Sequence, residues 1–161
     1  MSNIFIERAA AVENLVADEL REIWGISFNP TSRYHCADFI LYRNGIRCGV
    51  VEVKERHIAS DAYNTAVFEL AKAQKILKCA DNLPVFLIFV YEDCTLWHRL
   101  NPDLSGYRRR DMRVTTPLSG NRSQRNILIN SAEFCRLQVI PPEFCKEEVC
   151  VNSLSVRTRE P

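Results

Sequence analysis

Residues 37–54 decide the fold, and they read ADFILYRNGIRCGVVEVK. Two apolar runs lie on either side of Asn44-Gly45, a dipeptide that strongly favours the tight turn of a β-hairpin. Each run also carries an acidic residue in apolar surroundings, Asp38 in the first and Glu52 in the second. Because functional sites are where a sequence departs from its own local pattern, this hairpin is also the first place to look for chemistry.

The second run ends in Glu52-Val53-Lys54, and alternation along a strand places Glu52 and Lys54 on the same face. Two carboxylates that converge from neighbouring strands make a site of hard oxygen ligands, which suits Mg²⁺. The carbonyl of Val53 could supply a third oxygen, and the ammonium of Lys54 could orient a water molecule or stabilise charge on a phosphate. The hairpin therefore predicts a metal site with Asp38 and Glu52 as ligands.

The register of the hairpin tests this site. A two-residue turn with Arg43 opposite Ile46 would place Asp38 opposite Val51, and thus on the other face from Glu52. The site needs one extra residue, which a three-residue loop or a β-bulge provides and a left-handed glycine readily allows. We expect this irregularity at the turn, and a regular two-residue hairpin without a bulge would contradict the site.

Hydrophobic periodicity extends the pattern outward from the hairpin. Residues 6–24 have apolar side chains on one broad arc, which indicates an amphipathic helix, and Gly25 then ends it. The run 85–91 is apolar on both faces, as in a central strand that is covered on both sides. This αβββαβ order predicts an α/β fold with a mixed sheet and helices on both faces. The expected elements are helices at 6–24 and 62–79, and strands at 26–29, 37–42, 48–54 and 85–91.

Beyond Glu92 the pattern is weaker and indicates a β-rich C-terminal extension. The length favours one domain, which we place at 1–150, followed by a polar and flexible tail at 151–161. The expected elements of the extension are an edge strand at 95–99, a long polar loop at 101–125, and short strands at 126–130 and 134–140.

Charge is unevenly spread, although the net charge is only +1. Between Arg99 and Arg125, seven arginines stand against Asp103 and Asp111. This excess could follow a phosphate backbone, or it could simply be a solvated loop. The residues that we expect to bind nucleic acid are Lys75, Lys78, Arg108, Arg109, Arg110 and Arg113.

Polar residues also interrupt the apolar faces of both helices. In the expected helix 62–79, Gln74 falls in the middle of the buried stripe, where an amide needs partners. Facing the sheet, it could bind a water molecule at the metal or a carboxylate, or it could complete a hydrogen bond in the core. On the first helix, Glu13 and Glu19 lie at the two edges of the apolar arc, and one of them could approach the carboxylates as a further ligand.

The amino-acid composition is that of a globular protein and argues against a membrane protein. Apolar residues make up 47% and charged residues 25%, which is typical of a globular domain, and no run of about 18 apolar residues predicts a membrane helix. Seven cysteines without an export signal indicate reduced thiols and a cytoplasmic protein. A zinc site is the alternative, but the chain has no CxxC and Cys94-x3-His98 lacks a second pair, so we expect buried structural cysteines.

The motif resembles that of the PD-(D/E)xK nuclease superfamily, with Ala37-Asp38 in place of Pro-Asp, thirteen intervening residues, and then Glu52-Val53-Lys54. The resemblance covers about residues 6–92 and implies a restriction-endonuclease-like αβββαβ core. With Glu13 and Gln74 included, the pattern is similar to archaeal Holliday-junction resolvases and related restriction-type enzymes. It implies that Asp38 and Glu52 hold the metal, that Lys54 is catalytic, and that Glu13 and Gln74 support the site. From Arg99 onward the chain matches no pattern that would carry over a substrate class.

The resulting hypothesis is a Mg²⁺-dependent DNA nuclease in which Mn²⁺ can substitute and a water molecule attacks the phosphorus in line. Symmetric cutting of two strands would need a homodimer.

One alternative is a nucleic-acid-binding module that has this fold but no catalysis. Another is a protein-interaction domain in which Glu52 and Lys54 are an exposed pair; a buried Asp38–Glu52 pair would exclude it. Chemistry at Cys36 beside His35 is disfavoured, because adjacent strand residues face opposite ways.

Overall fold

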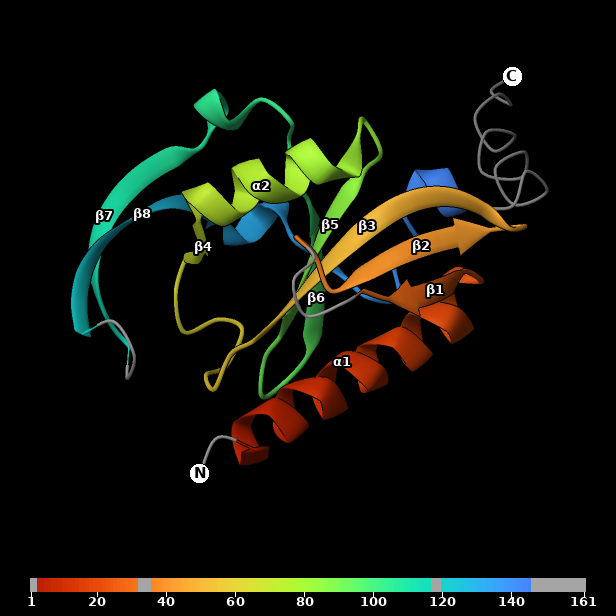
Figure 1. Cartoon of the computed structure of the whole chain (residues 1–161), viewed down its shortest axis with the longest axis horizontal. Helices are drawn as coiled ribbons and strands as arrows, with labels where there is room; N and C mark the ends of the chain where they lie inside the picture. The colour runs from red at the N-terminus through yellow and green to blue at the C-terminus, as the bar shows by residue number, and fades with distance from the viewer. Residues whose placement is uncertain (1–2, 32–35, 117–119, 146–161) are drawn as a thin grey trace, which may run out of the picture.

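A six-stranded mixed sheet forms the centre of the protein, in the order β1-β2-β3-β5-β6-β9 (Figure 1). The account rests on a computed structural model that describes residues 3–31, 36–116 and 120–145. Strands β3 and β5 are parallel and the other neighbours are antiparallel. The sheet contains β1 Ser27–Pro30, β2 Phe39–Arg43, β3 Ile46–Glu55, β5 Val85–Val90, β6 Thr95–Arg99 and β9 Cys135–Arg136.

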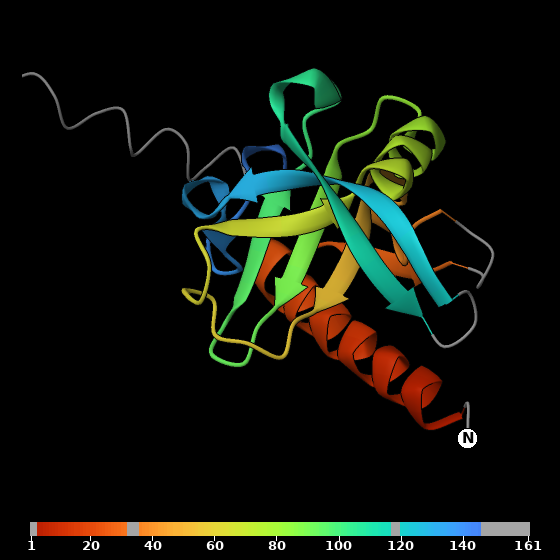
Figure 2. The ribbon, with the colours of Figure 1, turned by 90° about the vertical axis from the view of Figure 1, so that its left-hand side faces the viewer.

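Helices cover both faces of this sheet, as expected (Figures 1 and 2). Helix α1, Asn3–Trp24, packs Val16, Leu20 and Trp24 on one face, and helix α2, Leu70–Ala80, packs Ala73 and Ile76 on the other. Strand β5 contributes to both apolar clusters, because its alternate side chains point to opposite faces. This confirms the mixed α/β fold with a β-rich C-terminal part.

Strand β4, Thr65–Glu69, lies where the sequence pattern predicted the first part of a helix. The prediction of one helix over 62–79 is therefore wrong, because α2 begins only at Leu70. Strand β4 pairs antiparallel with β8, Gly120–Asn130, so that Val67 lies opposite Leu128. A strand of this kind is stabilised by a partner some 60 residues away, and local periodicity does not show such a partner.

The arginine-rich segment is a long β-hairpin, and the expectation of a polar loop over 101–125 is wrong. Strands β7, Arg108–Thr116, and β8 pair along their length and join β4 in a second sheet of three strands (Figure 2). At the base of this hairpin, the Tyr107 hydroxyl pairs with Nε2 of His98 at 2.7 Å and accepts a hydrogen bond from the backbone N–H of Asn101 at 2.9 Å. The predicted strand 126–130 is the end of β8, and of the predicted strand 134–140 only β9 forms.

The hairpin β2–β3 contains the bulge that the site requires, but beyond the turn and not in it. Asn44 and Gly45 both have positive φ and form a two-residue turn between Arg43 and Ile46. The register then shifts between Leu41 and Tyr42, where Cys48 of β3 has no partner, and Phe39 lies opposite Val51. One further step brings Asp38 level with Glu52 on a shared face.

The sequence predicts no membrane helix and a polar tail at 151–161. Neither helix among the described residues is long and apolar enough to cross a membrane. The expected tail at 151–161 lies outside the described residues.

Candidate active site

Asp38 lies just before β2, and the backbone of the neighbouring strand holds its side chain. The backbone N–H of Asp38 donates to the carbonyl of Val51 at 3.1 Å, and the backbone N–H of Val53 donates to Oδ2 of Asp38 at 2.7 Å. Thr31 donates its backbone N–H to the Asp38 carbonyl at 2.9 Å. These bonds fix the carboxylate beside β3 and leave Oδ1 for another partner.

Glu52 lies in the middle of the site, with only 1% of its surface exposed. Its Oε1 is paired with Nζ of Lys54, and Nζ of Lys72 lies 3.2 Å from its Oε2. Oε2 accepts no hydrogen bond of normal geometry, so the Lys72 contact is an ion pair only. Burial raises the pKa of Glu52, the nearby Asp38 raises it further, and Lys54 and Lys72 oppose the rise.

Glu13 of α1 is a further carboxylate whose pKa responds to the charges of Asp38 and Glu52. It is partly buried, and its pKa is raised by burial and then by the negative charges of Asp38 and Glu52. The negative charges of this pair therefore act on Glu13, and the positive charges of Lys54 and Lys72 oppose them. Of the two glutamates that the helix pattern left open, Glu13 is the one in electrostatic contact with this pair.

The carboxylate and carbonyl oxygens of this site are suitable ligands for a divalent cation. Among the described residues, however, no group of three or more acidic, Cys or His side chains is close enough to hold one. Glu52 Oε2 is a buried oxygen without a hydrogen-bond donor, and the register of the hairpin places Asp38 level with Glu52 on the neighbouring strand. The N–H and C=O of a strand residue point the same way, so the Val53 carbonyl also faces Asp38. Such oxygens are the ligands that Mg²⁺ prefers.

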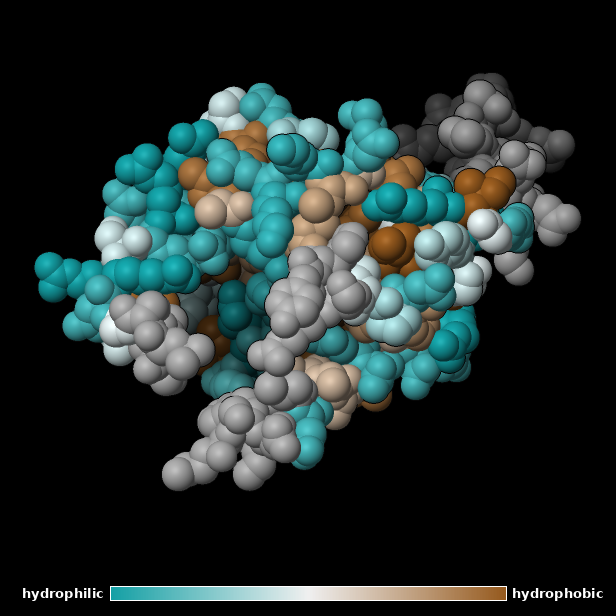
Figure 3. All heavy atoms as spheres, viewed as in Figure 1, coloured by the Kyte–Doolittle hydropathy of each residue, from teal (hydrophilic) through white to brown (hydrophobic). Residues whose placement is uncertain are grey.

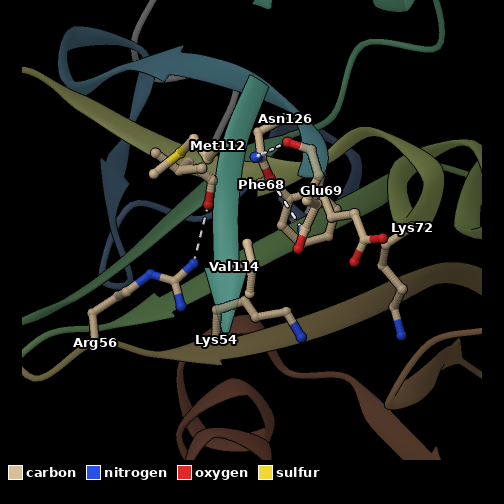
Figure 4. A pocket seen from close by; sticks show the side chains of 10 residues that line it. Lys54, Arg56, Phe68, Glu69, Lys72, Met112, Val114 and Asn126 are labelled. Atoms are coloured by element: carbon tan, nitrogen blue, oxygen red, sulfur yellow. Dashed lines mark hydrogen bonds between the residues drawn. The ribbon is translucent and has the colours of Figure 1, made fainter. Parts of the chain in front are cut away.

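A pocket of about 460 Å³ opens next to these carboxylates, between the end of β3 and the second sheet (Figure 4). Figure 3 shows a hollow in the surface where the β7–β8 hairpin meets the body of the molecule. Lys54, Arg56 and Lys72 bring three cationic side chains to the lining, against one carboxylate, Glu69. Arg56 donates to the carbonyl of Val67 at 3.0 Å, and burial lowers the pKa of its guanidinium. The pocket therefore suits an anionic ligand such as a phosphate.

The opposite wall of this pocket comes from one face of the β7–β8 hairpin. Met112, Val114 and Gln124 line it, and the register places Arg110 opposite Asn126 and Arg122 opposite Val114 on that same face. Of the arginines predicted to bind nucleic acid, Arg108 and Arg110 are therefore on the pocket face. Arg109 and Arg113 are on the other face.

Gln74 is not where the helix pattern placed it, and the prediction of a buried amide is wrong. It is exposed and lines a second pocket of about 240 Å³ with Arg122, Ser123, Gln124 and Arg125. The buried stripe of α2 consists of Ala73, Ile76 and Ala80, because the helix starts later than expected. Lys75 and Lys78 are exposed on the same helix.

Lys72 is the site residue that the sequence reasoning missed. Its signal appears only once the start of α2 at Leu70 is known, because a lysine in the first turn of a helix opposes the positive end of the helix dipole. Such a placement calls for a negative partner, and the partner is Glu52 of β3.

A central mixed sheet that brings Asp38, beside β2, together with Glu52 and Lys54 of β3 defines a PD-(D/E)xK nuclease-type domain. A family model described as "Phage putative PDDEXK endonuclease" matches residues 7–120, and the chain belongs to this family. Among solved structures, the chain is similar to Hjc of Archaeoglobus fulgidus, described as a Holliday junction resolvase from an archaeal hyperthermophile. The TM-score is 0.46 at 13% identity, over 74% of this chain and 85% of that one. No curated protein matches the sequence.

Proposed function

We propose that this protein is a divalent-metal-dependent endonuclease that hydrolyses phosphodiester bonds of DNA. One observation carries the proposal. The bulge in β3 brings Asp38 level with Glu52, and Lys54 lies between this pair and a cationic pocket. Membership of a PD-(D/E)xK endonuclease family supports the same reaction class.

Each residue of the site has a role that its surroundings support. Asp38 and Glu52 would hold the cation with the Val53 carbonyl, and Glu13 would add a carboxylate from α1. A bound Mg²⁺ or Mn²⁺ supplies positive charge to the phosphate and lowers the pKa of water. Lys54 would contact the scissile phosphate or the attacking water, because its ammonium lies at the boundary between Glu52 and the pocket.

The path of the substrate strand follows from the charge around the pocket. Lys54, Arg56 and Lys72 are on one wall, and Arg110 and Arg122 are on the facing side of the hairpin. A strand that runs between these walls would have its phosphates neutralised without contacts that read the bases. Cutting both strands of a duplex symmetrically would need a second copy of the chain.

The proposal is tested by incubating the protein with linear, circular, branched and single-stranded DNA and with RNA, each in Mg²⁺, Mn²⁺ or EDTA. We expect cleavage of at least one DNA substrate in Mg²⁺ and Mn²⁺ and none in EDTA. Internal cutting of circular DNA would identify an endonuclease. Binding of DNA without cleavage in either metal would reject the proposal and favour a binding module on the same fold.

A further inference from the structure

Lys72 has a contact that the nuclease motif does not explain. It comes from the first turn of α2, and its Nζ lies 3.2 Å from Oε2 of Glu52, which is a residue of β3. The contact joins two elements that are far apart in the sequence. It also places a cation against the positive end of the helix dipole, which is unfavourable unless a negative group compensates.

Glu52 therefore carries an ammonium group on each of its carboxylate oxygens, Lys54 on Oε1 and Lys72 on Oε2. Each carboxylate oxygen has a second lone pair, but an ammonium group on the same oxygen repels a divalent cation, so cation binding is favoured when one ammonium moves away. Glu52 is nearly fully buried, so solvent weakens the repulsion between a lysine and a metal ion beside it only a little. A cation that binds Glu52 and the lysines that neutralise Glu52 thus compete for the same oxygens.

Of the two lysines, Lys72 is the one whose displacement the geometry favours. Its contact with Oε2 lacks the geometry of a hydrogen bond, whereas Lys54 donates a hydrogen bond to Oε1. Lys72 also lines the pocket that would hold the substrate strand, so its ammonium has a second anionic partner within reach (Figure 4). A lysine stem has four flexible bonds and adapts to such a change at low cost.

We propose that Lys72 is a positioning residue that alternates between two partners. In the metal-free protein it neutralises buried Glu52 through Oε2; when a divalent cation binds Glu52, Lys72 leaves this oxygen and pairs with a phosphate of the substrate in the pocket. The inference rests on the proposed metal-dependent nuclease function. It assigns to α2 a lysine outside the Asp38, Glu52 and Lys54 motif.

The test is to measure Mn²⁺ binding by titration calorimetry, without DNA, for the wild type, Lys72→Met, Lys72→Arg and Lys75→Met. Methionine keeps the apolar stem and removes the charge. Lys75 is an exposed lysine on the same helix without an ion pair among the described residues, so it serves as the matched control. We expect Lys72→Met to bind Mn²⁺ about tenfold more tightly than the wild type, because the competing ion pair is gone. Lys72→Arg and Lys75→Met should stay near the wild-type affinity.

A second measurement tests whether Lys72 binds a phosphate of the substrate. Binding of DNA in Ca²⁺ should weaken for Lys72→Met and recover in Lys72→Arg, since arginine also binds phosphate. Unchanged or weaker Mn²⁺ affinity in Lys72→Met would overturn the inference and leave the proposed nuclease function standing, provided that the wild type binds Mn²⁺ and cuts DNA. If the wild type binds no divalent cation, the proposed function fails first and the inference fails with it.

Discussion

The backbone N–H of Val53 donates a hydrogen bond to the side chain of Asp38 at 2.7 Å. This contact ties the carboxylate at the start of one strand to the backbone between Glu52 and Lys54 on the next. It exists because Cys48 is an extra residue in β3, and without that bulge Asp38 would lie opposite Val51. The proposed metal site therefore depends on a local irregularity at Cys48, which lies between its two carboxylates in the sequence.

Replacing Lys54 by alanine should lower the rate of DNA cleavage by about 100-fold or more, because one charged group at the reacting phosphate is lost. DNA binding should change little, since Arg56 and Lys72 still line the pocket. Single-turnover cleavage and a filter-binding assay measure the two effects separately. Glu22→Ala, at an exposed position of α1, is the control and should cut normally. A Lys54→Ala variant that cuts at the wild-type rate would refute the role given to Lys54.

The stability of the metal-free protein should depend on pH through Glu52. Its pKa is raised above the usual 4.5, chiefly by burial, so the folded state binds the proton more tightly than the unfolded state. The stability that this group contributes is complete below about pH 4.5 and is lost as the pH rises through the raised pKa of the folded protein. We expect the wild type to lose free energy of unfolding over this range relative to Glu52→Gln.

Adding Mg²⁺ should oppose this loss, because a cation stabilises the ionised carboxylate. Thermal unfolding of the wild type and Glu52→Gln from pH 4 to 8, with and without Mg²⁺, measures both effects. Subtracting the free energy of unfolding of one protein from that of the other removes the contributions of acidic residues whose pKa is lowered, such as Asp93. If the difference does not vary with pH, the carboxylate is not desolvated as described.

The two faces of the β7–β8 hairpin should differ in DNA binding. Replacing Arg110 and Arg122 on the pocket face by alanine should weaken binding and reduce the slope of affinity against salt concentration by about one for each lost phosphate contact. The matched control replaces Arg109 and Arg113 on the other face, which removes the same charge. Equal losses for the two pairs would show that the register does not decide which arginines meet DNA.

Gly49 should be required for the packing beside the bulge. A Cβ at this position would lie 3.3 Å from the carbonyl oxygen of Pro84 and 3.3 Å from Cδ1 of Leu41. The Pro84 carbonyl accepts a hydrogen bond from Val50 at 3.0 Å and cannot move freely. Gly49→Val should therefore lower the free energy of unfolding by about 1–3 kcal/mol. Urea denaturation measures this loss, with Gly106→Val as the control because a Cβ there meets open space.

The central part of the fold was predictable from the sequence because its signals are local. The Asn44-Gly45 turn, the apolar runs and the position of Asp38 relative to Glu52 together required the bulge. The pairing shows that the bulge is in β3 beyond the turn, which the positions of the acids alone do not specify.

The second sheet was not predictable in the same way. Strand β4 depends on β8 for its partner, and the exposed arginines of β7 lack the alternation of a half-buried strand. Helix α2 starts at Leu70, so residues before it do not define its buried face. In the structure Gln74 is exposed, and Lys72 in the first turn lies next to Glu52. One misplaced boundary thus exchanged one predicted site residue for another.

The most direct measurement compares DNA cleavage by the wild type and Asp38→Asn in Mg²⁺ and in EDTA. The asparagine oxygen can still accept the hydrogen bond from Val53, so the hairpin should fold, while the cation loses a charged ligand. We predict that the wild type cuts only in Mg²⁺ and that the folded Asp38→Asn protein does not cut in either condition. Cleavage by Asp38→Asn at the wild-type rate, or cleavage by the wild type in EDTA, would contradict the proposed metal site.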